Sequence, residues 1–313
     1  MLDAFLSSEV RPRDVLIFGL QTPGISEPFS VGNLTIHPDF NLRTYLEGYP
    51  VDDVGFIVGS EVTFGRCQPR SGPRPYLFTP RLEDDCLGPF RLFKAGWLAA
   101  VGVMPIIESG GIEIRGELGI SEQPFGQNWA EPMHYAVAAD EIPAIQRIYE
   151  DLLSIPQGYL ELALRRFGRS YEYYSHCEHV GLSELDDCIV DLVIALESVT
   201  SRGGDSIRQS MALRTALLVG DTLDERMNVE QMVKRFYDLR SKIVHGGQRD
   251  TISDKEHEER FIMAEALRSL ARKAIDASIR ILISSAPEFA VSHSRPKPMA
   301  ELIDQHLFRT LHA

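Results

Sequence analysis

The distribution of apolar and polar residues changes about halfway along the chain. Up to about residue 138, short β-like runs alternate with Gly, Pro, Asn and Asp, which favour turns. A Gly59-Ser60 pair between two of these runs suits a tight hairpin turn. The pattern predicts an antiparallel β domain, as a sandwich or a partly closed barrel, over residues 1–138. The predicted strands lie within residues 14–20, 53–58, 61–66, 75–79, 90–103, 111–117 and 133–138.

From about residue 139 the apolar residues recur at helical spacing. Sequences typical of capping boxes stand at Ser183–Asp186, Thr222–Glu225 and Ser253–Glu256. Ser206 and Gly220 are typical residues for the start and the end of one further helix. The class expected is therefore α+β, with a β-rich unit at 1–138 and a helical unit at 139–313. The predicted helices are 142–153, 157–170, 183–199, 207–219, 223–244, 253–284 and 299–311.

Composition and charge limit the classes of function. The 313 residues suffice for two domains, and the formal net charge of −13 argues against general nucleic-acid binding. One stretch departs from this balance, because residues 234–249 hold five basic residues and one acid. A local cationic surface of this kind can still attract phosphate. The basic residues are Lys234, Arg235, Arg240, Lys242 and Arg249, and the acid is Asp238.

The sequence predicts a cytoplasmic protein without a membrane span. No window approaches the roughly 18 apolar residues that a spanning helix needs, and the first residues lack a signal-peptide pattern. The four cysteines form no CxxC pair, so buried reduced thiols are expected. His176 and His179 could bind a metal, but no second ligand pair accompanies them. No metal or cofactor is therefore expected.

Arg240 and His245 are the residues most suited to chemistry. Val233, Phe236, Arg240 and Val244 share one side of the predicted helix, which places a guanidinium in line with apolar side chains. Such a group is costly to bury unless it meets a carboxylate, a phosphate or an interface, although it could instead reach water at the flank. His245 stands where the helix ends, where a histidine also interacts well with the helix dipole.

The spacing keeps these two side chains apart on one helix. Five residues turn a helix by about 140°, so Arg240 and His245 point to different sides, whereas Ser241 and His245 share a side. The pair could act together if the helix unwinds after His245 or if two chains share a site. Glu197 and Arg214 are lone charges on strongly apolar helices. A half-buried pair between them, or between Glu197 and Arg240, is the simplest interpretation.

Three segments together resemble the Apea-like HEPN family in order, spacing and helical context. They are residues 186–197 (DDCIVDLVIALE), 212–220 (ALRTALLVG) and 237–247 (YDLRSKIVHGG), and the resemblance covers about residues 150–285. It implies an up-and-down helical bundle that dimerises and places two Arg-x4–6-His motifs together. Many such domains are metal-independent ribonucleases of toxin, antiphage or RNA-processing systems.

Carried over by position, the resemblance assigns Arg240 and His245 as the catalytic pair. The RNA 2′-hydroxyl would attack the adjacent phosphate, with the histidine moving the proton and the arginine stabilising the phosphoryl charge. Ser241 stands where many such nucleases have Asn, Asp or His, so a non-catalytic nucleotide- or RNA-binding dimerisation module is the alternative. The β-rich unit is expected to sense a trigger. Supporting roles fall to Ser241, Glu197 and Arg214, and RNA binding to Lys242, Arg249 and Arg235.

Overall fold

A computed structural model divides the chain into two compact units, residues 1–150 and 151–313. The division lies inside helix α5 (Ile142–Ser154), whereas the sequence pattern placed it between residues 138 and 139. Each unit is described by itself. The structure describes residues 11–18, 25–38, 63–67, 82–95, 98, 100–109, 112–115, 119–120, 135–155, 158–171, 182–201, 206–245, 254–285 and 299–312.

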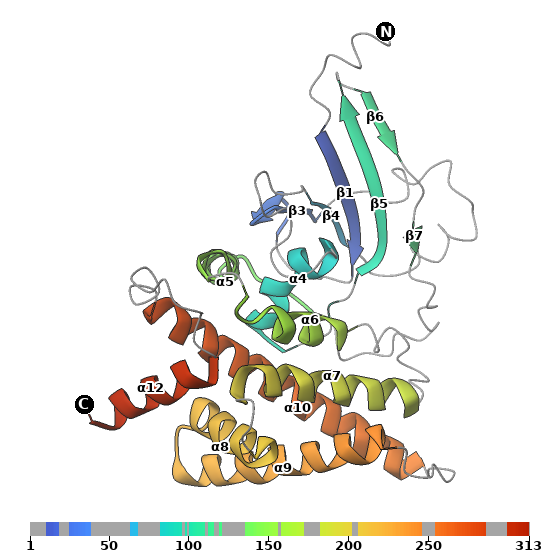
Figure 1. Cartoon of the computed structure of the whole chain (residues 1–313). Helices are drawn as coiled ribbons and strands as arrows, with labels where there is room; N and C mark the ends of the chain where they lie inside the picture. Colours follow the sequence, from blue (N-terminus) through green and yellow to red (C-terminus); the bar gives the residue numbers. More distant parts are fainter. Residues whose placement is uncertain are drawn as a thin grey trace. The chain divides into compact units, whose positions relative to one another are not determined.

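The described strands of the first unit belong to one antiparallel sheet (Figure 1). Its order is β2-β3-β4-β1-β5-β6, and β7 pairs with β5. The antiparallel pairing was predicted, but these strands do not form the two packed sheets of a sandwich. Their bounds are β1 Arg11–Phe18, β2 Phe29–Val31, β3 Leu34–His37, β4 Thr63–Cys67, β5 Ala100–Ser109, β6 Ile112–Arg115 and β7 Gly119–Ile120.

One predicted strand was wrong over most of its first part. Helix α4 (Leu82–Phe93) ends inside the stretch 90–103, and β5 begins only at Ala100. Gly88 and Pro89 disfavour a helix interior, which explains why local patterning concealed α4. The end of the predicted strand 133–138 forms only a single bridge in its described part, while residues 53–58 and 75–79 lie outside the described residues.

The β2–β3 hairpin is held to α5 at its turn. Gly32 adopts a φ of +59°, a left-handed conformation that favours glycine, and its N–H donates to Oε1 of Gln146 at 2.9 Å. A Cβ on Gly32 would overlap the ring of Tyr149. The turn therefore needs glycine both for its backbone and for the close approach of α5.

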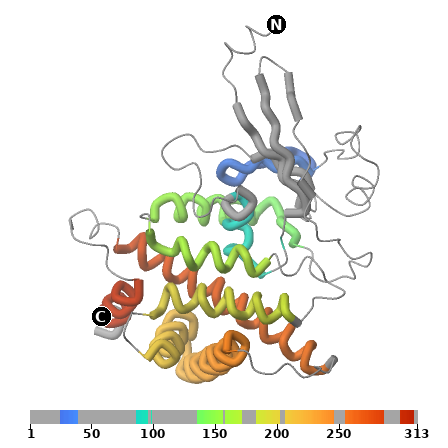
Figure 2. The backbone as a smooth tube through the Cα atoms, turned by 45° about the vertical axis from the view of Figure 1, so that its right-hand side comes forward, coloured from blue at the N-terminus to red at the C-terminus, as the bar shows by residue number. Residues whose placement is uncertain are grey.

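The second unit is a bundle built around α7 (Leu182–Thr200), as Figures 1 and 2 show. The apolar side chains that recur along α7 are fully buried, among them Leu185, Ile189, Leu192, Val193 and Leu196. The prediction that this helix is central to its core is confirmed. Around it pack α6 (Glu161–Arg169), α8 (Ile207–Val219), α9 (Leu223–Val244), α10 (Asp254–Ser284) and α12 (Met299–His312).

The start signals were only partly correct. Thr222 and Glu225 form the predicted capping box, in which the Glu225 N–H donates to Thr222 Oγ1 at 3.2 Å. The box predicted at Ser183 is wrong, because α7 begins one residue earlier and Ser183 bonds to the neighbouring carboxylate of Glu184. Ser206 occupies the N-cap of α8 but makes no side-chain capping bond.

The described part of α7 also carries a buried carboxylate, Asp186, which pairs with Arg260 of α10. Among the described helices, none combines the length and the apolar character that a membrane span requires.

Cys188 is free and buried, as expected, but Cys86 is disulfide-bonded, so the expectation of reduced thiols is wrong there. The side chain of Cys67 and all of Cys177 lie outside the described part of the chain.

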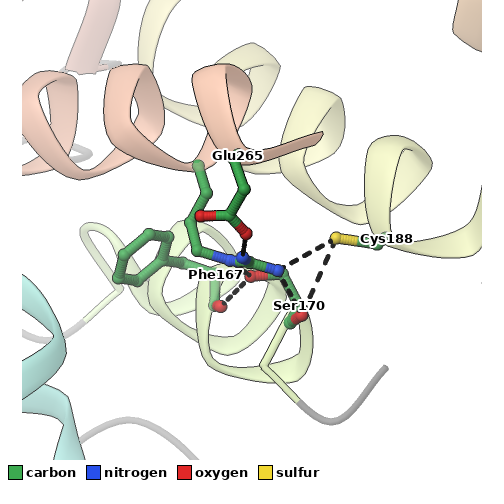
Figure 3. Close-up of polar contacts among 5 residues, drawn as sticks. Phe167, Ser170, Cys188 and Glu265 are labelled. Carbon is green, nitrogen blue, oxygen red and sulfur yellow. Dashed lines mark hydrogen bonds and ion pairs between the residues drawn. The ribbon is translucent and has the colours of Figure 1, made fainter. Parts of the chain in front are cut away.

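A buried arginine joins three helices in the interior of the bundle (Figure 3). Arg268 of α10 donates to the carbonyl oxygen of Ser170 at 2.9 Å and to Sγ of Cys188 at 3.3 Å, and it pairs with Glu265. Its guanidinium also lies 4.9 Å from the ring centroid of Tyr171. These contacts offset the cost of burying the Arg268 charge. They also link the C-terminal end of α6 to α7 and α10.

Candidate functional site

The face of α9 that packs against the bundle becomes exposed to solvent at the C-terminal end of the helix. Val233 and Phe236 are buried, Arg240 is half-buried one turn later, and Val244 is 54% exposed one further turn along. All four lie on the side predicted to be apolar. The face that packs into the core therefore continues outward as a surface that begins at Arg240.

Arg240 has a buried guanidinium nitrogen that forms no hydrogen bond within the described part of the chain. Its Nε is buried and makes no hydrogen bond, and no described carboxylate pairs with the side chain. Its one ring contact is with Tyr237, whose centroid lies 6.0 Å from Cζ. A buried donor without a partner is costly, so this arrangement is one that an anion could complete.

His245 caps the same helix end. Its backbone N–H donates to the carbonyl of Ser241 at 3.1 Å, and its side chain is exposed. Ser241 is half-buried one turn before it, so the predicted succession of Ser241 and His245 along one side is retained. Arg240 and His245 reach the same end of α9 but, as the helical spacing requires, not the same side.

The cations of this region are unequally available. Lys234 pairs with Glu230 at 2.5 Å, and Arg208 of α8 binds Asp238 with two hydrogen bonds of 2.7 Å. The bond from Arg208 lowers the pKa of Asp238 and keeps that carboxylate ionised.

Two further cations remain available on α9. Arg235 and Lys242 are exposed, and neither forms a salt bridge with a described residue. Arg235 and Lys242 lie two turns apart on one side of α9, whereas Arg240 is about 140° from Arg235 around the helix, so the three share the C-terminal half of α9 but not one face. The remaining predicted RNA-binding residue, Arg249, lies outside the residues that the structure describes.

The predicted pairing of Glu197 is wrong. Arg214 instead donates to both carboxylate oxygens of Asp304 in α12, at 2.8 and 3.0 Å, and to the carbonyl of Thr200 at 2.8 Å. Glu197 makes no side-chain hydrogen bond with Arg214, with Arg240 or with another described residue.

The direction of the helices bears on these two charges and the candidate site. α7 and α9 run in opposite directions in Figure 1, so their C-terminal ends, to which Glu197 and Arg240 belong, point opposite ways. The supporting role of Arg214 and Glu197 stays a prediction. The bond of Arg214 to Asp304 joins α8 to α12. No local pattern indicates Asp304 as the partner, because it is separated from Arg214 by 90 residues.

In the described part of the chain, no group of three or more His, Cys, Asp or Glu could hold a metal ion. The His176 and His179 pair lies outside that part. Arg240, Ser241, Lys242 and His245 thus form the candidate site, with Arg235 beside it. Comparison with models of protein families, with curated proteins and with solved structures found no match to this chain.

Proposed function

We propose that the helical unit is an RNA-directed module of the HEPN type that cleaves RNA at a site which two copies of the chain build from Arg240 and His245. The observation that carries the proposal is Arg240, with a buried Nε that has no hydrogen-bond partner, on a face that ends in exposed Val244. A half-buried guanidinium without a carboxylate is suited to binding phosphate.

A dimer would allow Arg240 and His245 to act together, although they point to different sides of one helix. Arg240 and His245 are about 140° apart around α9, so one copy does not direct both at one phosphate. Val244 is 54% exposed and lies between them in sequence, so a second copy that covered it would come close to both side chains. A two-fold axis near Val244 would bring Arg240 of one copy toward His245 of the other.

The chemistry needs only these groups and the RNA itself. A neutral His245 accepts the proton of a 2′-hydroxyl while that oxygen attacks the adjacent phosphorus. The bond to the 5′-oxygen breaks, and the leaving oxygen receives a proton, which gives a 2′,3′-cyclic phosphate and a 5′-hydroxyl. Arg240 stabilises the charge on the phosphoryl oxygens, and Arg235, Lys242 and Arg249 hold the backbone.

The test is cleavage of labelled RNA by the full chain in EDTA, with mass spectrometry of the new ends. We expect cyclic-phosphate ends from the unmodified chain and loss of cleavage in His245→Ala and in Arg240→Met. His306→Ala and Arg165→Met are matched controls, since both residues are exposed and lie on other helices. Mixing the two inactive variants should restore part of the activity if the site is shared between copies.

Two results would count against the proposal. Cleavage that persists in both variants would remove Arg240 and His245 from the site. RNA binding that depends on Arg240, without cleavage under any condition that supports dimerisation, would favour the non-catalytic binding and dimerisation module.

A further inference from the structure

The α8–α9 hairpin carries a second exposed surface, at the end of α9 opposite His245. Three large apolar side chains are exposed there: Leu213 at 46%, Leu223 at 71% and Met227 at 50%. Scattered single apolar residues on a surface need no explanation, but a cluster of them marks an interaction site. Whether these three form a cluster follows from the geometry of the hairpin.

The hairpin brings the three side chains together. α8 and α9 are joined by only three residues, 220–222, and they run side by side in both ribbon views. Gln209 of α8 donates to Glu230 of α9 at 3.3 Å, which fixes the pairing of the two helices. In an antiparallel pair, the turn after Gln209 lies opposite the turn before Glu230, so Leu213 faces the level of Met227. Leu223 follows one turn away from Met227.

Two exposed acidic residues lie close to Leu223 and Met227 in sequence. Asp221 lies in the link before α9 and Asp224 in its first turn; both are exposed and form no salt bridge with a described residue. Glu225 is occupied by the capping box, where bonds from the Thr222 and Asp221 backbone N–H groups lower its pKa. Asp221 and Asp224 therefore lie next to the apolar cluster in sequence and have no salt-bridge partner among the described residues.

We infer that this hairpin patch, formed by Leu213, Leu223, Met227, Asp221 and Asp224, docks a basic amphipathic helix of a partner protein. The apolar stripe of such a helix would cover the three apolar side chains, and its Lys and Arg residues would meet the two carboxylates. Charge complementarity selects this occupant. RNA and an anionic membrane would be repelled by the same carboxylates.

A second copy of the chain fits the hairpin patch poorly. A two-fold contact centred on the patch would place Asp221 and Asp224 of one copy against the same residues of the other. Like charges held together in this way oppose association. The inference is also independent of the proposed function, since it concerns residues 213–227 rather than the Arg240 end of α9.

A synthetic helix provides the probe. A fluorescent 18-residue peptide with a leucine stripe and a lysine face is titrated with the full chain at physiological salt, and its anisotropy is measured. We expect saturable binding that weakens at least about tenfold in the double variant Leu223→Ser/Met227→Ser and in Asp221→Asn/Asp224→Asn. The controls are Phe308→Ser, an exposed apolar residue of α12, and Glu161→Gln, an exposed acid of α6.

The outcomes separate the occupants. Equal affinity of the patch variants and the controls would overturn the inference, because the peptide would then respond to the overall charge. Equal binding of a peptide with glutamates in place of lysines would overturn the charge argument. Sedimentation without peptide tests the second copy: a dimer lost only in Leu223→Ser/Met227→Ser would show that the patch is a self-association surface and would also overturn the inference.

Discussion

Two arginines on adjacent helices are expected to respond in opposite directions to the same substitution. Arg214 is only 11% exposed and donates to Asp304 and to the carbonyl of Thr200. Arg240 is half-buried, and its Nε has no hydrogen-bond partner. Methionine keeps most of the apolar stem and has a similar helix propensity, so substitution by methionine isolates the guanidinium group in both cases.

The magnitudes follow from what each guanidinium leaves behind. Arg240→Met removes a buried donor that lacks a partner, worth about 1–3 kcal/mol. It also loses a contact with the Tyr237 ring, worth about 0.5–1 kcal/mol. The free energy of unfolding should therefore rise by about 1 kcal/mol. Arg214→Met breaks charge-assisted bonds and leaves the Thr200 carbonyl unpaired, so the same quantity should fall by about 2–3 kcal/mol.

Urea unfolding measures the free energy of unfolding of both variants, and the first unit of the same chain serves as an internal reference. Both tryptophans, Trp97 and Trp129, belong to the first unit, so their fluorescence follows residues 1–150. Circular dichroism at the helix band mainly follows the helical unit. If Arg240→Met lowered the free energy of unfolding as much as Arg214→Met does, Arg240 would be a structural residue, and the reasoning that reserves it for an anion would be refuted.

Four other changes test the structure more briefly. Arg268→Met should lower the free energy of unfolding by about 3 kcal/mol, since it leaves buried acceptors unpaired; a urea midpoint equal to that of the unmodified chain would contradict this. Burial raises the pKa of Cys188 to about 11, so this thiol should resist maleimide at pH 8 until the chain unfolds. Rapid labelling of Cys188 in the native protein would contradict its burial. Because the pKa of Glu225 is lowered on folding, its contribution to stability is present above the unfolded pKa and is lost as the pH falls through the folded pKa. The difference in stability between the unmodified chain and Glu225→Gln should therefore shrink below about pH 4.5 in acid titrations, and a constant difference would refute it. Gly32→Ala should destabilise the first unit by about 1–3 kcal/mol, because φ is positive and the Tyr149 ring occupies the space of the new Cβ. The tryptophan fluorescence should then change at a lower urea concentration than in the unmodified chain.

The helices were predictable where the determining signals are local. α9 begins and ends at the predicted residues because its capping box and its apolar spacing all lie within the helix. α4 was missed because Gly88 and Pro89 point away from the helix that buried Leu87 and Phe90 stabilise. Tertiary burial outweighs local propensity there, and local patterns carry no record of it.

The candidate site divides in the same way. The position of Arg240 in line with Val233 and Phe236 follows from helical spacing, and the structure retains it. The partner of Arg214 does not follow from spacing, because Asp304 comes from a helix near the far end of the chain. Lone charges on apolar helices predict that a partner exists, but only the packing of the helices decides which carboxylate it is.

The net charge of −13 of the whole chain does not predict which ligands the two ends of α9 attract. Residues 221–230 hold four acids and one base, whereas residues 231–245 hold four bases and one acid. Asp224 and Arg240 are sixteen residues apart, about 24 Å along a helix, and charges at physiological salt are screened over about 8 Å. The acidic turn and the basic turn are therefore about three screening lengths apart, so the charge of one hardly affects a ligand at the other. An acidic chain can in this way offer phosphate a cationic surface at one end of a helix while the other end attracts a basic partner.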